Sequence, residues 1–168
     1  HPHYAFDAIY NANLPAAAGH MAEEQAFTQG KSELAIYHDY LNASHQGAVN
    51  EPYPGIIALN QNAAILHYDV KSHQAEAHAQ TLLIDAGANN AGYASDITRT
   101  FSQDTGLFQA MLNSMENLQL SLCEQAIAGV DFNDLHNKCV EGIAHILIEH
   151  KICSLSLEEQ LEKRIPQV

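Results

Sequence analysis

The sequence predicts an α+β fold with an antiparallel sheet. Two observations support this class: apolar residues recur at helical spacing towards both ends of the chain, and short β-type runs separated by turn residues fill the middle. These runs follow one another without intervening helices, which favours antiparallel pairing over alternating strand–helix–strand units. With 168 residues, of which 46% are hydrophobic, the chain is long enough for one domain with a real core.

The first third of the chain predicts two helices after an irregular start. Residues 1–14 show no clear period, so we expect an irregular lead-in there. A helix is predicted over Pro15–Gln29, because proline suits a first helical turn and Gly30 suits the exit. Ser32 has the position of an N-cap, and the helix that it begins is expected to end near residues 44–47.

The middle of the chain predicts four strands in two hairpins. A turn at residues 51–55 precedes two short apolar runs, 56–60 and 63–68, which a Gln-Asn pair separates. A polar, histidine-rich loop is expected over 69–79. Two further β-type runs lie on either side of the turn signal at 89–92.

The remainder of the chain is predicted to be helical. A long helix is expected over 107–128 and is closed by Gly129, and another is expected over 133–150. Ser156 is predicted to cap a short helix over 157–164. Apolar residues repeat every four positions in the second of these helices and indicate a buried stripe: Leu135, Cys139, Ile143 and Leu147.

Composition limits the expected partners and location. Lys and Arg number 7 against 20 Asp and Glu, a formal net charge of −13, which repels nucleic acid and anionic lipid. No apolar run approaches the ~18 residues of a membrane span, and no signal peptide is visible, so we expect a cytoplasmic protein. The 3 cysteines lack CxxC spacing and predict buried free thiols.

Two aspartates, Asp85 and Asp96, are the most informative residues of the chain. Each lies in a β-type run beside the turn. A hairpin centred between Asn90 and Ala91 would set them directly opposite, with Cβ atoms roughly 4.5–5.5 Å apart. Opposed like charges destabilise a sheet, and a bound cation would remove that penalty. The pattern therefore predicts the carboxylate pair of a metal site.

Plainer interpretations remain open for these residues. Asp85 can be a strand-ending residue that starts the turn, and Asp96 can be a surface residue paired with Arg99 or Lys71. On local evidence His67, in an apolar run, is a satisfied core histidine. If the two hairpins share one sheet, it would instead face the carboxylate pair.

Several motifs, in a fixed order and spacing, carry a family likeness: Gly30–Glu33, Pro52-Tyr53 with Ile57–Asn60, Ala64–Tyr68, Leu83–Ala88, and Gly92-Tyr93 with Ser95–Phe101. Together they resemble the bacterial Xaa-Pro dipeptidases (prolidases), metallopeptidases of the pita-bread fold, and in particular the marine subgroup also called organophosphorus acid anhydrolases. The likeness covers roughly residues 15–165. It implies that 15–168 is the N-terminal half of a pita-bread catalytic domain, with helices on one face of an antiparallel sheet.

The resemblance also implies roles for individual residues. In the family, the position matching Asp85 ligates one of two divalent metal ions, and that matching Asp96 bridges both. His67 matches a catalytic position that contacts the substrate, and Tyr53 matches a residue of the substrate pocket. Carboxylate ligands select hard cations, so Mn²⁺ is expected, with Co²⁺ or Mg²⁺ as alternatives.

The implied activity is hydrolysis of Xaa-Pro dipeptides, with organophosphate hydrolysis as a side activity, and a homodimer is what the family suggests. The family completes its site with a His in a Pro-His-Gly-Leu-Gly-His segment and two later glutamates, which this sequence lacks. The sequence ends at Val168, about where that segment begins. We therefore expect the isolated chain to be inactive. The alternatives are a non-catalytic pita-bread binding module and a truncated inactive remnant.

Overall fold

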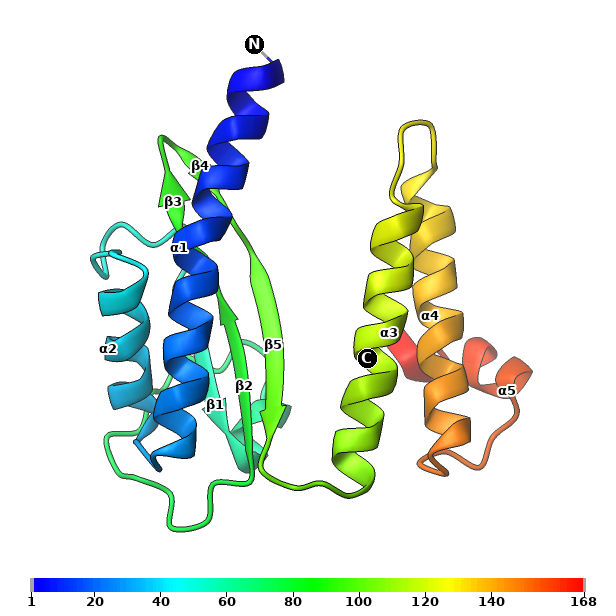
Figure 1. Ribbon diagram of the computed structural model, residues 1–168. Helices are drawn as coiled ribbons and strands as arrows, with labels where there is room; N and C mark the ends of the chain where they lie inside the picture. The colour runs from blue at the N-terminus through cyan, green and yellow to red at the C-terminus, as the bar shows by residue number, and fades with distance from the viewer. Residues whose placement is uncertain (1, 168) are drawn as a thin grey trace. The chain divides into compact units, whose positions relative to one another are not determined.

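The computed structural model describes residues 2–167 and divides the chain into two units, His1–Asp104 and Thr105–Val168. The first unit contains all the strands, and the second is helical among its described residues. The elements of the first unit, drawn in Figure 1, are α1 (Pro2–Thr28), α2 (Glu33–Ala43), β1 (Ile56–Leu59), the 3₁₀ turn η1 (Asn60–Ala64), β2 (Thr81–Ala86), β3 (Asn89–Asn90), β4 (Tyr93–Ala94) and β5 (Ile97–Ser102).

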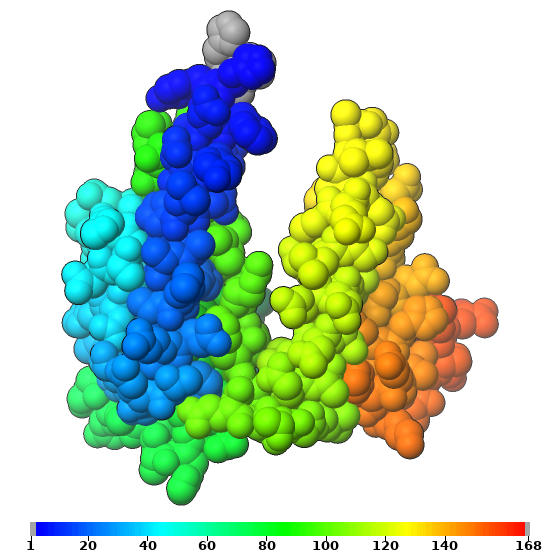
Figure 2. Space-filling view, in the orientation of Figure 1, coloured from blue at the N-terminus to red at the C-terminus, as the bar shows by residue number. Residues whose placement is uncertain are grey.

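The sheet of the first unit has three antiparallel strands in the order β1-β2-β5. Helices α1 and α2 lie side by side (Figure 2) and cover one face of this sheet. Side chains that alternate along β1 and β2 point into the layer between sheet and helices, where they form the core with the following residues: Phe27, Ile36, Tyr40, Ile57, Leu59, Leu82, Ile84 and Ala86. The predicted α+β class, with an antiparallel sheet and helices on one face, is confirmed.

The expected irregular lead-in over residues 1–14 is wrong, because α1 runs through Pro2–Thr28; His1 lies outside the described residues. The physical reason is a stripe of small residues, since Ala8, Ala12 and Ala16 are all buried at helical spacing. Alanine also has the highest helix propensity. Pro15 therefore lies inside the helix instead of at its start, and burial of this stripe outweighs the loss of one backbone hydrogen bond.

The predicted hairpin over 56–60 and 63–68 is also wrong. Only its first half is a strand, and β1 pairs with β2. The chain turns at Asn60, whose φ is 51° and whose Oδ1 accepts hydrogen bonds from Gln80 N at 2.8 Å and Thr81 N at 3.2 Å. This amide cap fixes the end of β1 against the start of β2. The second apolar run becomes the end of η1 and a loop in which Ile65 and Leu66 are exposed and Tyr68 is buried.

The turn before β5 differs from the expected one by one residue. Ala91 and Gly92 both have positive φ, 52° and 83°, as the central residues of a type I′ turn require. The hairpin is therefore centred between Ala91 and Gly92, and Asp85 pairs with Thr98 instead of Asp96. The whole register shifts by two positions, and a shift of two keeps every side chain on its expected face.

The second unit consists of α3 (Leu107–Gln125), α4 (Phe132–Glu149), α5 (Leu157–Glu162) and the 3₁₀ turn η2 (Ile165–Gln167). The first helix ends three residues before the expected 128, and Gly129, with φ 93°, lies in the following turn. Ser156 caps α5 as predicted, in a reciprocal capping box with Glu159. The expected stripe on α4 is half-buried. The most buried residues of the helix are instead Val140, Ala144 and Ile146.

The cysteines and the helices each bear on an expectation from the sequence. The three cysteines are free, as predicted, but Cys123 is exposed instead of buried, and Cys139 and Cys153 are half-buried. Between residues 2 and 167, no helix combines the length and the apolarity needed to cross a membrane.

Candidate metal centre

The residues singled out by the sequence line a single cavity of about 490 Å³ in the first unit. Tyr53, His67, Asp85 and Asp96 all contribute side chains to it. They come from four separate segments: the bend before β1, the loop after η1, strand β2 and the residue just before β5. The cavity is completed by Pro54, Ile56, Tyr68 and Asp69.

Alternation along β2 places Asp85 on the cavity side of the sheet. Its neighbours Ile84 and Ala86 are 0% exposed and point into the helix-covered core. Successive side chains of a strand face opposite sides, so Asp85 faces away from the helices, beside Ile56 of β1. Asp96 comes from the chain that returns to the sheet after the turn, and its side chain is exposed.

The hydroxyl of Tyr53 joins the two aspartates. It lies 2.9 Å from Asp85 Oδ1 and 2.8 Å from Asp96 Oδ1. A phenol has one proton, so it can donate to only one of these oxygens at a time. Burial, followed by the hydrogen bonds to Asp96 and Asp85, raises the pKa of Tyr53, so this proton stays in place. The site therefore gathers three oxygens around a single proton, an arrangement that a cation would stabilise.

The donor chemistry of this site fits a divalent metal ion, but the number of donors is small. Carboxylate oxygens suit hard cations such as Mg²⁺ and Mn²⁺. Such ions take about six ligands, and two aspartates supply only part of that set. Within the described residues, no group of three or more His, Cys, Asp or Glu side chains is arranged to hold a metal ion.

His67 reaches the cavity from a loop, not from the strand that the sequence predicted. Its backbone has φ 55°, in the left-handed region, and its side chain is exposed. The expectation that it belongs to a core strand is therefore wrong. The alternative expectation was that it would face the carboxylates, and the structure brings it to the same cavity.

Glu33 holds the loop that carries His67, a role that the sequence did not predict. Its Oε2 accepts hydrogen bonds from the Tyr68 hydroxyl at 2.7 Å and from Ser72 N at 2.9 Å. Its position directly after an N-cap serine suggested only a helix start. A glutamate is rarely buried unless its carboxyl group is paired, and Glu33 is 1% exposed. This burial indicates a role beyond starting the helix.

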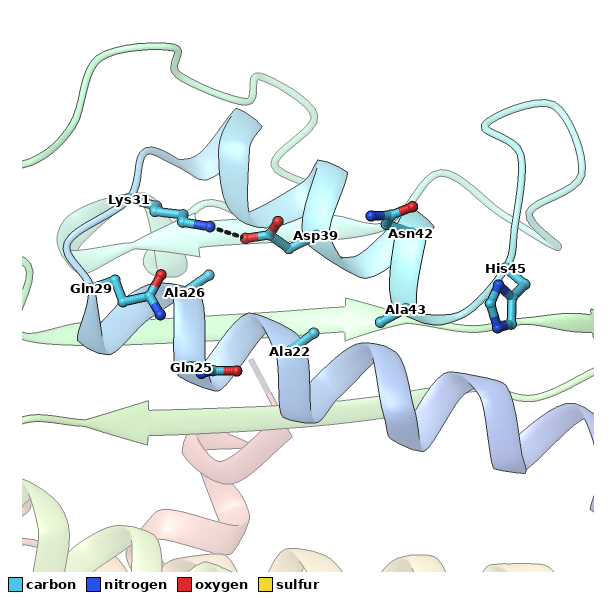
Figure 3. A pocket seen from close by; sticks show the side chains of 9 residues that line it. All are labelled: Ala22, Gln25, Ala26, Gln29, Lys31, Asp39, Asn42, Ala43 and His45. Carbon is cyan, nitrogen blue, oxygen red and sulfur yellow. Dashed lines mark hydrogen bonds and ion pairs between the residues drawn. The ribbon is translucent and has the colours of Figure 1, made fainter.

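A second cavity, of about 460 Å³, lies between α1 and α2 and is shown in Figure 3. Its lining is mainly alanine and amide side chains. Its one lysine, Lys31, forms an ion pair with Asp39 at 2.7 Å. These two charges neutralise each other, so this cavity offers less to a charged ligand than the acidic one does.

Comparison with known proteins identifies the class to which this fold and site belong. The model of metallopeptidase family M24 matches residues 7–160, so the chain belongs to this family. Members of the family use divalent metal ions.

Two curated relatives and one solved structure illustrate the match. The chain is 41% identical to a Xaa-Pro dipeptidase of Shewanella amazonensis, over 98% of this chain and 38% of that protein. It is 41% identical to a Xaa-Pro dipeptidase of Actinobacillus pleuropneumoniae, over 96% of this chain and 37% of that protein. Zn-substituted Escherichia coli aminopeptidase P in complex with product superimposes with a TM-score of 0.82 at 21% identity, over 95% of this chain and 37% of that one.

These matches identify the fold and show how much of each relative's length the chain covers. Aminopeptidase P is a pita-bread protein, and the predicted pita-bread architecture is confirmed for this part of it. The chain spans about 38% of the length of the Xaa-Pro dipeptidases that it resembles.

Proposed function

We propose that this chain is the N-terminal part of the catalytic domain of a Xaa-Pro dipeptidase, and that Asp85 and Asp96 ligate two divalent metal ions. The observation that carries this proposal is the cavity in which the Tyr53 hydroxyl lies within 3 Å of one oxygen from each aspartate. Mn²⁺ is the expected metal, with Co²⁺ or Mg²⁺ as alternatives. When bound, the metal ions supply a nucleophile from water at neutral pH and polarise the scissile carbonyl.

The residues of the chain have distinct tasks in this proposal. Asp85 and Asp96 bind the metal ions and neutralise part of their charge. Tyr53 donates a hydrogen bond to one of these carboxylates at a time and so limits its rotation. His67 lies exposed in the cavity, where its ring can donate a hydrogen bond to the oxygen on which charge develops.

Two finer features belong to the same proposal. Organophosphate hydrolysis would use the same carboxylate pair, because a tetrahedral phosphorus centre resembles the tetrahedral intermediate of peptide hydrolysis, and we propose it only as a side activity. A cytoplasmic location and a homodimeric assembly stay predictions.

The test is a chimera in which this chain replaces the matching segment of the Shewanella amazonensis dipeptidase, over the 165 aligned residues. We expect Mn²⁺-dependent cleavage of Xaa-Pro dipeptides. Asp85→Asn and Asp96→Asn should each lower kcat/KM by about 10³-fold or more, since metal activation contributes several kcal/mol. The matched control is Asp7→Asn, an exposed aspartate of α1 outside the cavity, which should leave the rate unchanged.

Two results would count against the proposal. Wild-type rates in either cavity variant would remove the metal role of that aspartate. A folded chimera that binds Mn²⁺ but cleaves no Xaa-Pro dipeptide would favour the non-catalytic binding module instead.

The 168-residue chain itself gives an independent measurement. With two carboxylates as its main ligands, we expect it to bind Mn²⁺ with a dissociation constant of about 10⁻⁴–10⁻³ M, the range of weak oxygen-ligand sites. Isothermal titration should detect this binding, and the double variant of Asp85→Asn and Asp96→Asn should abolish it. Sub-micromolar binding would mean that further residues of the chain complete the site.

A further inference from the structure

The two candidate ligands adjoin a buried backbone bend formed by residues 86–88 and 95, whereas the turn beyond it, residues 89–94, is exposed or half-buried. Ala86, Gly87 and Ala88 follow Asp85 directly, and all three are buried. Ser95 is 2% exposed, precedes Asp96 and pairs with Ala88 through Ser95 N and the Ala88 carbonyl oxygen at 2.9 Å. The bend therefore links the two aspartates, and its position sets how far apart their carboxylates lie.

Each residue of this bend is held by a different buried side chain. The Tyr40 hydroxyl donates to the Gly87 carbonyl oxygen at 2.6 Å, and His20 Nε2 lies 3.2 Å from the Ala86 carbonyl oxygen. A carbonyl can only accept, so Nε2 of His20 carries the proton. Ser95 Oγ accepts from Ala88 N at 2.9 Å and donates to a carbonyl of α1 at 3.0 Å.

The elements around the bend are closely packed. A Cβ atom on Gly87 would lie 2.0 Å from the Ser95 carbonyl oxygen, so the two sides of the bend are in direct contact. A Cβ atom on Gly19 would lie 2.4 Å from the Tyr40 ring, so that ring rests on the backbone of α1. His20 and Tyr40 also meet edge to face, with ring centroids 5.9 Å apart.

We propose that Tyr40 and His20 are positioning residues of the metal centre, which fix the separation of Asp85 and Asp96 through the carbonyls of Gly87 and Ala86. This inference rests on the proposed metal function of the two aspartates. Neither side chain lines the cavity, and each holds the bend through a hydrogen bond to a backbone carbonyl. Groups that orient metal ligands from outside the ligand shell contribute about 10–100-fold to metal affinity.

The first test compares two tyrosines of the same helix. Tyr40→Phe removes only the hydroxyl that holds Gly87. Tyr37→Phe is the matched control, because the Tyr37 hydroxyl donates to Glu51 and not to the bend. In the 168-residue chain, electron paramagnetic resonance should find Mn²⁺ bound about 10-fold more weakly by Tyr40→Phe and unchanged in Tyr37→Phe. Equal effects of the two substitutions would reduce Tyr40 to a stabilising residue and overturn the inference.

The second test uses rescue at His20. The amide of His20→Gln can still donate to the Ala86 carbonyl, whereas His20→Leu cannot. We expect His20→Gln to keep most of the Mn²⁺ affinity and His20→Leu to lose about 10-fold. Equal affinity in the two variants would remove the role of His20, and these variants also decide the matter if Tyr40→Phe fails to fold.

The chimera separates positioning from chemistry. Tyr40→Phe should raise the Mn²⁺ concentration needed for half-maximal activity by the same factor, while kcat at saturating Mn²⁺ stays near that of the parent. If Mn²⁺ binding does not depend on Asp85 and Asp96, the proposed function fails and this inference fails with it. If it depends on the aspartates but not on Tyr40 or His20, only this inference fails.

Discussion

Two glutamates in the first unit are equally buried and have opposite surroundings. Glu33 is 1% exposed and Glu23 is 0% exposed. Neither oxygen of Glu23 has a hydrogen-bond partner within residues 2–167. Glu33 instead accepts hydrogen bonds from these donors: Leu59 N at 2.8 Å, Asn62 Nδ2 at 2.8 Å, Tyr68 Oη at 2.7 Å and Ser72 N at 2.9 Å.

The comparison shows two ways in which a fold can bury a carboxyl group. Around Glu33, donors from the end of β1, from η1 and from the loop near His67 converge, so one side chain organises a wall of the candidate metal cavity. Around Glu23, burial and then the negative charges of Glu51 and Asp39 raise the pKa of the carboxyl to about 9. The side chain of Glu33 organises structure, whereas the carboxyl group of Glu23 holds a proton at neutral pH.

The largest expected effect is that of Glu33→Ala, which would leave four donors without their acceptor. We expect the free energy of unfolding to fall by about 3–5 kcal/mol, as when one partner of a buried polar network is removed. Tyrosine fluorescence in urea is the measurement, because all 7 tyrosines precede residue 105 and report on the first unit. Glu33→Gln, which keeps one acceptor oxygen, should lose less. A loss below ~1 kcal/mol in Glu33→Ala would contradict the organising role.

Glu23→Gln should change the pH dependence of stability. Between about pH 4.5 and 9 the folded chain holds a proton on Glu23 that the unfolded chain has lost. The free energy of unfolding therefore falls as pH rises through this window, by at most about 1.4 kcal/mol per pH unit. Glu23→Gln removes this contribution and should be about 1–3 kcal/mol more stable than the parent at pH 8. Urea unfolding at several pH values from 5 to ~9 is the measurement, and parallel curves for parent and variant would contradict the assignment.

Tyr68→Phe removes one of the donors to Glu33 and keeps the buried ring. We expect a loss of about 1–2 kcal/mol, typical of a hydrogen bond to a carboxylate whose other donors remain. Amide hydrogen exchange over residues 65–72 should become faster. The control is Tyr10→Phe, at a residue that is 59% exposed. An equal effect in both variants would mean that the bond from Tyr68 to Glu33 contributes nothing.

The smallest effect is expected at the surface. Lys31 and Asp39 form an ion pair at 2.7 Å, as short as the bond from Tyr68 to Glu33, but their side chains are 39% and 34% exposed. Lys31→Ala should therefore lower the free energy of unfolding by only about 0.5 kcal/mol. High salt should remove even this difference. A loss above ~1 kcal/mol in Lys31→Ala would show that burial does not explain the difference between this ion pair and the hydrogen bond from Tyr68 to Glu33.

The sequence predicted the elements whose ends are defined by local chemistry. Ser32 and Ser156 begin helices as N-caps, and Gly30, with φ 71°, ends α1. The predictions failed where distant residues decide the conformation. Ala8 and its stripe on α1 become helical because they pack against the sheet, and the second apolar run, 63–68, stays out of the sheet because Asn60 redirects the chain to β2.

The candidate site follows the same division. The sequence by itself determined that Asp85 and Asp96 flank a turn between two strands, because β-type runs and turn residues act over short distances. Only the tertiary structure decided that the Tyr53 hydroxyl joins the two carboxylates and that Glu33, Tyr40 and His20 hold the segments around them. These contacts join residues far apart in the chain, whose partners are fixed by packing of helices on the sheet and not by any local pattern.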